Sequence, residues 1–184
     1  MNASEVAGSG ADRSGEQVQG VEKYFVPVKA GCSDERVVEL REGESITKIL
    51  EVISTERGRA ITELVLVREG EDELSGAGLV DAQYPHRRRH HVHYAGAVAV
   101  TVYYQAGEHR REFKRHASVE EVLIWAIGAF NIDPSMATEF ELARRGQTEE
   151  LPTTEHIGHL AGHHHELELD LVRGDIANGG SRDY

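Results

Sequence analysis

Cysteine and long apolar runs are scarce in this sequence. Cys32 is the single cysteine among 184 residues, so no disulfide can form within the chain. No apolar run approaches the roughly 18 residues that a membrane-spanning helix needs. Residues 1–20 are polar and rich in Gly, Ser and Glu, without the apolar segment of a signal peptide. We therefore expect a cytoplasmic protein with a disordered leader over residues 1–22.

Positive charge is scarce relative to negative charge. The chain has 20 Lys and Arg against 32 Asp and Glu, which gives a formal net charge of -12. Because an acidic protein repels the phosphates of nucleic acids and anionic lipids, we expect neither a nucleic acid nor a membrane as a partner. Apolar residues make up 39% and charged residues 28% of the chain, which is a globular composition. Other proteins are the partners that fit best.

Arrangements of residues that carry catalysis are also missing from the sequence. We find no pairing of nucleophile and base, no spaced set of metal ligands and no phosphate-binding loop. Cys32 lies in a turn-like segment at residues 30–34, where an ordinary turn cysteine is favoured over a catalytic thiol. We therefore expect no enzyme, no catalytic residue and no cofactor.

Histidine, in contrast, is abundant, with 11 residues in the chain. The histidines gather around residues 90–93 and around residues 159–165. Consecutive histidines on a strand point to alternating faces, and no cysteine or acid at a suitable spacing completes a tetrahedral set. The sequence therefore favours solvated histidines at a loop and a strand edge, titrating near about pH 6, over a metal site.

Hydrophobic patterning predicts one series of elements in the first half of the chain. Ile46, Ile49, Leu50 and Ile53 share one face of a helix that follows the N-cap residue Ser45. Alternating apolar residues predict strands on both sides of this helix. The expected order is strand 23–28, strand 35–40, a helix that ends near Gly58, strand 61–68 and strand 90–94.

The same order of elements returns in the second half. Ser118 and Glu121 form a capping box that opens a helix, and Asp133-Pro134 follows its end. The expected elements are strands 98–104 and 109–115, the helix 118–130, strand 139–144, a helical turn at 156–160 and strand 166–172. The chain is thus predicted to be an internal repeat.

A hairpin, one helix across the sheet and two further strands is the order of the β-grasp fold, with the first and last strands parallel at the centre. Two such units joined by Ala95-Gly96-Ala97 and followed by Gly179-Gly180 resemble the tandem ubiquitin-like modifiers. These include the interferon-stimulated eukaryotic modifier and bacterial proteins of antiphage defence operons. The resemblance implies an α+β fold of two tandem β-grasp domains, each a mixed sheet crossed by one helix. The expected domains are residues 23–95 and 96–173, with a flexible tail at 174–184.

The resemblance also implies how the tail would be used. Residues 181–184 would be an extension that a peptidase removes before Ser181, leaving the Gly180 carboxylate after Gly179 as the acyl donor. An activating enzyme would use ATP to activate that carboxylate. The activated protein would then be transferred to a conjugating enzyme and from there to target proteins. A metal-dependent isopeptidase is the remaining expected partner. Arg173 and Ile176 are candidate tail contacts for the activating enzyme.

Two further residues are candidates for a partner interface. Trp125 lies off the predicted apolar stripe of its helix, so it either packs on the flank of its own domain or contacts the other repeat or a partner. Arg144 lies in a stretch that is small and basic, where ubiquitin has its aliphatic receptor patch. We therefore expect ubiquitin receptors not to bind this protein.

Two other functions remain open beside the conjugated modifier. A noncovalent β-grasp adaptor would use its sheet faces, and its Gly-Gly pair would be replaceable. A sulfur carrier would form a thiocarboxylate at the terminal glycine, but such carriers are usually single domains that end directly in Gly-Gly. The duplication and the four residues after Gly180 count against the sulfur carrier.

Overall fold

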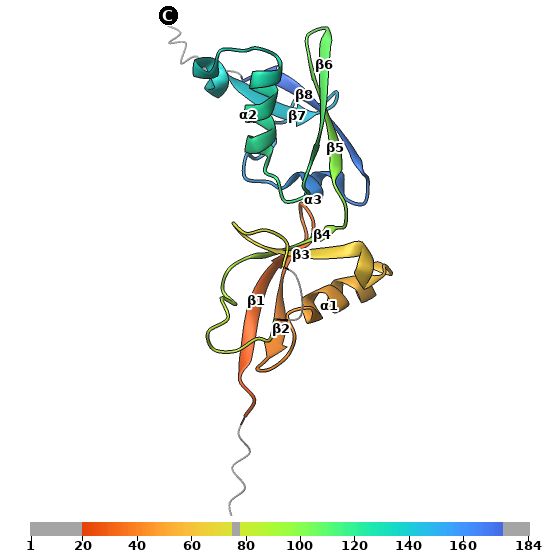
Figure 1. The fold of residues 1–184 in the computed structure, drawn as a ribbon, viewed down its shortest axis with the longest axis vertical. Helices are drawn as coiled ribbons and strands as arrows, with labels where there is room; N and C mark the ends of the chain where they lie inside the picture. Colours follow the sequence, from red (N-terminus) through yellow and green to blue (C-terminus); the bar gives the residue numbers. More distant parts are fainter. Residues whose placement is uncertain (1–19, 75–77, 175–184) are drawn as a thin grey trace, which may run out of the picture.

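Two sheets organise the residues that the structure describes. The structure is a computed structural model that describes residues 20–74 and 78–174 (Figure 1). The first unit comprises β1 (Lys23–Lys29), β2 (Glu35–Arg41), α1 (Lys48–Arg57), η1 (Ile61–Glu63), β3 (Leu64–Arg68) and β4 (His90–Tyr94). The second comprises β5 (Val98–Tyr104), β6 (Gly107–Phe113), α2 (Val119–Ala129), η2 (Pro134–Glu139), β7 (Phe140–Arg144), α3 (Ile157–Ala161) and β8 (Glu166–Arg173).

The two sheets have the same topology. Their strands lie in the orders β2-β1-β4-β3 and β6-β5-β8-β7. In each sheet the first and last strands are parallel neighbours at the centre, with Val28 opposite His90 in one and Val100 opposite Leu167 in the other. The remaining pairs are antiparallel. This arrangement confirms the expected α+β fold of two tandem β-grasp units, each a mixed sheet crossed by one helix.

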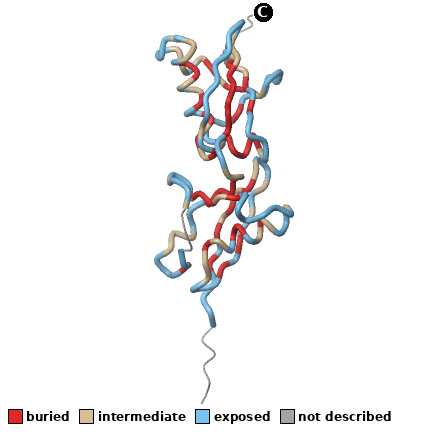
Figure 2. The backbone as a smooth tube through the Cα atoms, turned by 45° about the vertical axis from the view of Figure 1, so that its right-hand side comes forward, coloured by how far each residue is buried: buried red, intermediate tan, exposed pale blue. Residues whose placement is uncertain are grey.

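Each unit buries its own apolar core between the sheet and its helix. In the first, alternate residues of β1, such as Val26, face Ile49 and Ile53 of α1, and all three are fully buried. In the second, Val100 and Leu169 of the central strands face Val122 of α2 in the same way. Burying a side chain of this size contributes about 1.5–3 kcal/mol, so each unit has a core of its own. Figure 2 shows the buried segments running along the central strands and at the meeting point of the units.

The helix α2 begins as its sequence predicts. The Ser118 side chain accepts a hydrogen bond from the Glu121 amide at 3.2 Å, and the Glu121 carboxylate accepts one from the Ser118 amide at 2.7 Å. These reciprocal bonds satisfy two backbone donors that the helix itself leaves without partners.

Several element boundaries differ from the sequence prediction. Residues 61–63 form the 3-10 helix η1 rather than the start of a strand, and β3 begins at Leu64. A 3-10 helix that the sequence did not predict, η2, precedes β7. It starts at Pro134, and the side chain of its N-cap residue Asp133 accepts a hydrogen bond from the Ser135 amide. The second hairpin is tighter than expected, so β6 begins at Gly107 instead of His109.

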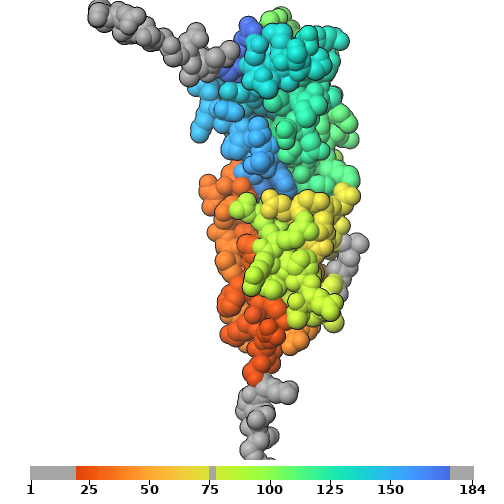
Figure 3. Space-filling view, turned by 90° about the vertical axis from the view of Figure 1, so that its left-hand side faces the viewer, coloured from red at the N-terminus to blue at the C-terminus, as the bar shows by residue number. Residues whose placement is uncertain are grey.

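The two units stack end to end along the long axis of the molecule (Figure 1). In the space-filling view, the segment around α3 of the second unit sits directly on the first (Figure 3). β8 starts at this junction and runs to the opposite end of the second unit, because it is parallel to β5, which follows the linker. Within the described residues, none of the helices is long and apolar enough to cross a bilayer.

Candidate functional site

The last described residues remain attached to the second sheet. Arg173 pairs with Phe140 of β7, and its Nε donates a hydrogen bond to the Glu139 carboxylate at 3.1 Å. The Gly174 amide donates to the Glu139 carbonyl at 2.8 Å. The Arg173 side chain is still 62% exposed, so the candidate tail contact lies on the surface. Its contact with an activating enzyme stays a prediction.

The other tail positions of the sequence analysis are Ile176, Gly179, Gly180 and Ser181. All four lie outside the described residues.

The outer face of the second sheet is polar. Tyr103 donates a hydrogen bond to Glu168 at 2.7 Å, and the Arg145 guanidinium lies over the Tyr103 ring at 3.8 Å. Arg145 also forms an ion pair with Asp170. Arg144 points elsewhere, because its Nη2 donates to the Leu160 carbonyl of α3 at 2.9 Å. A partner that binds this face therefore meets charged and aromatic groups.

Trp125 packs on the flank of its own domain. Its ring meets the Phe113 ring edge to face, with centroids 5.4 Å apart and planes at 73°. It lies against the core of the second unit, whereas the neighbouring Ile124 is 64% exposed. From its sequence position, Trp125 could pack on the flank of its own domain or contact the other repeat or a partner. This packing ties the side chain to β6, and any partner role stays a prediction.

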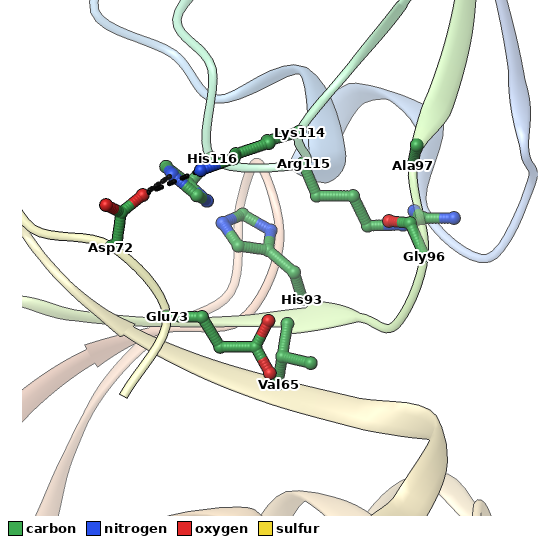
Figure 4. A pocket seen from close by; sticks show the side chains of 9 residues that line it. All are labelled: Val65, Asp72, Glu73, His93, Gly96, Ala97, Lys114, Arg115 and His116. Carbon is green, nitrogen blue, oxygen red and sulfur yellow. Dashed lines mark hydrogen bonds and ion pairs between the residues drawn. The ribbon is translucent and has the colours of Figure 1, made fainter. Parts of the chain in front are cut away.

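Polar contacts join the two domains around a narrow junction. Lys29 of β1 forms an ion pair with Glu155 of the second domain at 2.8 Å. The Asp72 carboxylate accepts a hydrogen bond from Lys114 Nζ at 3.0 Å. His116 Nε2 lies 3.3 Å from the same oxygen. Figure 4 shows Asp72, Lys114 and His116 near His93, which projects from β4 toward the second domain.

The buried Arg115 side chain at this junction hydrogen-bonds to the linker between the domains. Only 3% of the residue is exposed, and burial lowers the pKa of its guanidinium. It donates hydrogen bonds to the carbonyls of Gly96 at 3.2 Å, Gly162 at 2.7 Å and His164 at 2.8 Å. One buried cation thus ties the linker to the loop between α3 and β8.

Four histidines from the two domains meet at the same place. His91 and His93 lie on β4, while His156 is the N-cap of α3 and His159 lies within it. His91 Nδ1 lies 3.1 Å from His159 Nε2, and His93 Nε2 lies 3.0 Å from His156 Nδ1. We call these four residues the junction histidines.

The expectation of solvated histidines titrating near pH 6 is wrong for the junction. His91 and His93 occupy the outer face of β4, which α3 of the second domain covers, and they are 4% and 1% exposed. Burial lowers the pKa of His91 to about 3 and that of His159 to about 2. Burial likewise lowers the pKa of His93 well below its usual value. These imidazoles are therefore neutral at pH 7.

His90 is also buried, but on the opposite face of β4. Its Nε2 lies 2.7 Å from the Tyr84 hydroxyl, and its Nδ1 lies 2.8 Å from the Arg88 carbonyl. Burial lowers its pKa to about 4. In contrast, residues 163–165 are exposed as the sequence suggested. The histidine-rich stretches 90–93 and 159–165 contain three of the four junction histidines, and His156 lies just outside them.

A different spacing carries the signal for the junction histidines. His91 and His93 are two residues apart, which places them on one face of a strand, and His156 and His159 are three apart, which places them on one face of a helix. Each pair alone is common. Only the packing of α3 on β4 brings the pairs together.

Parts of this chain resemble a known family and a solved structure. Residues 99–174 match the family model described as BilA ubiquitin-like domain 2. Among solved structures, "Caldiarchaeum Subterraneum Ubiquitin" is similar, with 14% identity over 45% of this chain and 99% of that chain and a TM-score of 0.36. No curated protein matches the sequence. The family match over residues 99–174 and the strand order shared by both sheets fit two tandem ubiquitin-like domains.

Proposed function

We propose that this ubiquitin-like protein is a covalent modifier whose acyl donor is the Gly180 carboxylate. The observation that carries the proposal is the end of β8 at Arg173, after which residues 174–178 lead to Gly179-Gly180. Two glycines without side chains can thread a narrow enzyme channel that other residues cannot enter. The match to a ubiquitin-like family over residues 99–174 supports the same reading.

The proposed reaction sequence is carried out by partner enzymes. A peptidase hydrolyses the bond between Gly180 and Ser181 with water and frees the carboxylate. An activating enzyme joins that carboxylate to AMP from ATP, releasing pyrophosphate, and its cysteine thiol then displaces AMP to form a thioester. The acyl group passes to the cysteine of a conjugating enzyme and finally to an amine of a target protein. A metal-dependent isopeptidase hydrolyses the isopeptide bond between Gly180 and the target.

The mass of the intact protein from its native host tests this proposal. With an N-terminal tag, we expect loss of residues 181–184 and additional higher-mass adducts, and the adducts should vanish in Gly180→Ala. Gly20→Ala is the matched control, because a Cβ at Gly20 meets no atom within 4 Å. A full-length mass without adducts, with the partner enzymes present, contradicts the proposal.

A second candidate function, a noncovalent adaptor, is favoured by an apolar patch on the first domain. Phe25 and Val37 are 57% and 63% exposed, and Pro27 lies between them as the register partner of Val37. Exposed apolar groups gathered on one sheet face often mark a protein-binding surface. If the adaptor function holds, Phe25→Ser with Val37→Ser removes partner binding, whereas Gly180→Ala leaves it unchanged.

The biological setting we propose is bacterial antiphage defence, from the resemblance to tandem ubiquitin-like proteins of such operons. Plating efficiency of phage on cells that carry the whole operon tests it. Gly180→Ala should raise the efficiency to that of cells without the operon, and Gly20→Ala should not.

A further inference from the structure

The junction histidines form a two-plus-two arrangement across the domain boundary. β4 of the first domain supplies His91 and His93, and α3 with its N-cap supplies His156 and His159. The rings lie close together across the boundary, with centroids 4.1 Å apart and planes at 32° for His91 and His156, and 4.2 Å and 39° for His93 and His159. Each domain therefore presents half of one histidine set.

The spacing of the ring nitrogens suits a single metal ion. One nitrogen from each ring can be chosen such that all four lie within 4.8 Å of one another. A tetrahedral zinc site with bonds of about 2.0–2.1 Å separates its nitrogens by about 3.3–3.4 Å. The distances of 3.1 Å and 3.0 Å across the two histidine pairs are already near that value. Small ring rotations would bring the remaining nitrogens into range.

Hydrogen bonds within the protein do not satisfy this cluster. Among the described residues, His91 Nε2 and His93 Nδ1 are buried and have no hydrogen-bond partner. A buried polar group without a partner costs free energy, so native proteins contain few of them. They are the second nitrogens of two rings whose first nitrogens face the histidines of the other domain, so the protein alone does not satisfy the cluster.

We propose that His91, His93, His156 and His159 together bind one divalent transition-metal ion, with Zn²⁺ as the best fit, and that the ion fastens the two domains to each other. Neutral imidazole is the form that binds metal, and the burial of His91, His93 and His159 favours that form. The proposal is independent of the conjugation chemistry at Gly180.

The donor set selects the class of ion. Imidazole nitrogen suits zinc, copper, nickel and cobalt, whereas magnesium and calcium require oxygen donors, which these four rings do not offer. With four protein ligands the coordination shell is closed, which is typical of structural rather than catalytic zinc sites. The ion would therefore hold the domain arrangement and leave no open position for substrate.

Solvent-filled spaces give an ion access to the cluster. A cavity of about 280 Å³ is lined by His93 and Arg115, and Figure 4 shows His93 at its centre. A second cavity of about 180 Å³ is lined by both His93 and His159. An ion can thus reach the rings without unfolding either domain.

Titration of the full chain with Zn²⁺ and Co²⁺ tests the proposal. The protein must carry no histidine tag, and bound metal is first removed with a chelator. We expect one ion per chain by calorimetry, the intense visible absorption of tetrahedral Co²⁺, and no response to Mg²⁺. Zn²⁺ should also raise the unfolding temperature.

Matched histidine variants locate the site. His91→Gln with His159→Gln removes one ligand from each domain and should weaken Zn²⁺ binding on the order of 100-fold or more. His163→Gln with His164→Gln changes two exposed histidines just after α3 and should bind like the unaltered protein. Cys32→Ser, at an exposed thiol, should also leave binding unchanged.

Three results would overturn the proposal. These are no stoichiometric binding to the unaltered protein, equal affinity in the His91 and His159 double variant, and a weak octahedral Co²⁺ spectrum. Circular dichroism and Trp125 fluorescence check that the double variant folds. The Co²⁺ spectrum of the unaltered protein decides the geometry even if that variant does not fold.

Discussion

Lys29 of the first domain and Glu155 of the second form a nearly buried ion pair, with Nζ and Oε2 2.8 Å apart and side chains 13% and 8% exposed. Removing Lys29 leaves the Glu155 carboxylate buried without its ion-pair partner, and removing Glu155 leaves Lys29 only its longer pair with the exposed Glu35 at 3.8 Å. We predict that Glu155→Ala or Lys29→Ala alone lowers the free energy of unfolding by about 3–5 kcal/mol. Urea unfolding followed by Trp125 fluorescence and circular dichroism measures the change.

The matched control removes both charges at once. Lys29→Met with Glu155→Leu leaves no unpaired charge, so its cost should be well below the sum of the single changes. A double variant as unstable as that sum would show that the two residues act independently.

Gly158 allows the second domain to approach the first closely. A Cβ at this position would lie 2.7 Å from the Arg115 carbonyl oxygen and 2.7 Å from His93 Nδ1. We predict that Gly158→Ala destabilises the protein by about 1–3 kcal/mol, because backbone and buried rings must move. In the control Gly128→Ala, a Cβ in helix α2 meets nothing within 4 Å, so stability should rise by about 0.5–1 kcal/mol. Thermal unfolding distinguishes these opposite signs.

Acid should destabilise the metal-free protein through its buried histidines. The pKa of His91 is lowered to about 3 and that of His159 to about 2, against about 6.5 in the unfolded chain. The unfolded chain therefore binds more protons between these values, and stability that is complete above about pH 6.5 falls as the pH is lowered. Each such histidine should cost about 2 kcal/mol at about pH 5.

Unfolding in urea at about pH 7.5 and about pH 5 measures this loss in chelator-treated protein. The double variant His91→Gln with His159→Gln should show a smaller difference in the free energy of unfolding between the two pH values. It lacks two of the titrating groups, whereas its carboxylates are the same as in the unaltered protein. An unchanged difference would mean that these two histidines are protonated in the folded protein.

Substitution of Arg173 should affect thioester formation without affecting the stability of the fold. Its pair with Glu139 is at the surface, with the arginine side chain 62% exposed, so Arg173→Ala should leave the unfolding temperature unchanged. If the activating enzyme contacts this side chain, thioester formation should slow severalfold. Arg110→Ala removes a comparable surface pair with Glu166 and should affect neither measurement. Equal thioester rates in both variants would exclude Arg173 as a contact.

Local pattern was sufficient to predict most of the elements. Val26, Ile49 and Ile53 have the spacing that their burial requires, and the capping box at Ser118 starts α2 where expected. The sequence did not predict η2, because its start depends on one hydrogen bond that the Asp133 side chain accepts from the Ser135 amide rather than on hydrophobic period.

The junction histidines could not be found in this way. His91 and His159 are 68 positions apart in the chain and belong to different domains, so their approach depends on how one domain docks on the other. Hydrophobic periodicity describes which face of an element is buried but not which distant element buries it. The sequence of β4 alone predicts a solvated outer face, and this face is buried only because α3 packs on it.

The direction of β8 has a consequence for any molecule joined to its end. β8 leaves the junction and finishes at Arg173, at the pole of the second domain that is farthest from the first. A cargo or enzyme held at that pole is separated from the first domain by the whole length of the second. Phe25 and Val37 of the first domain therefore stay accessible to a second partner while that pole is occupied.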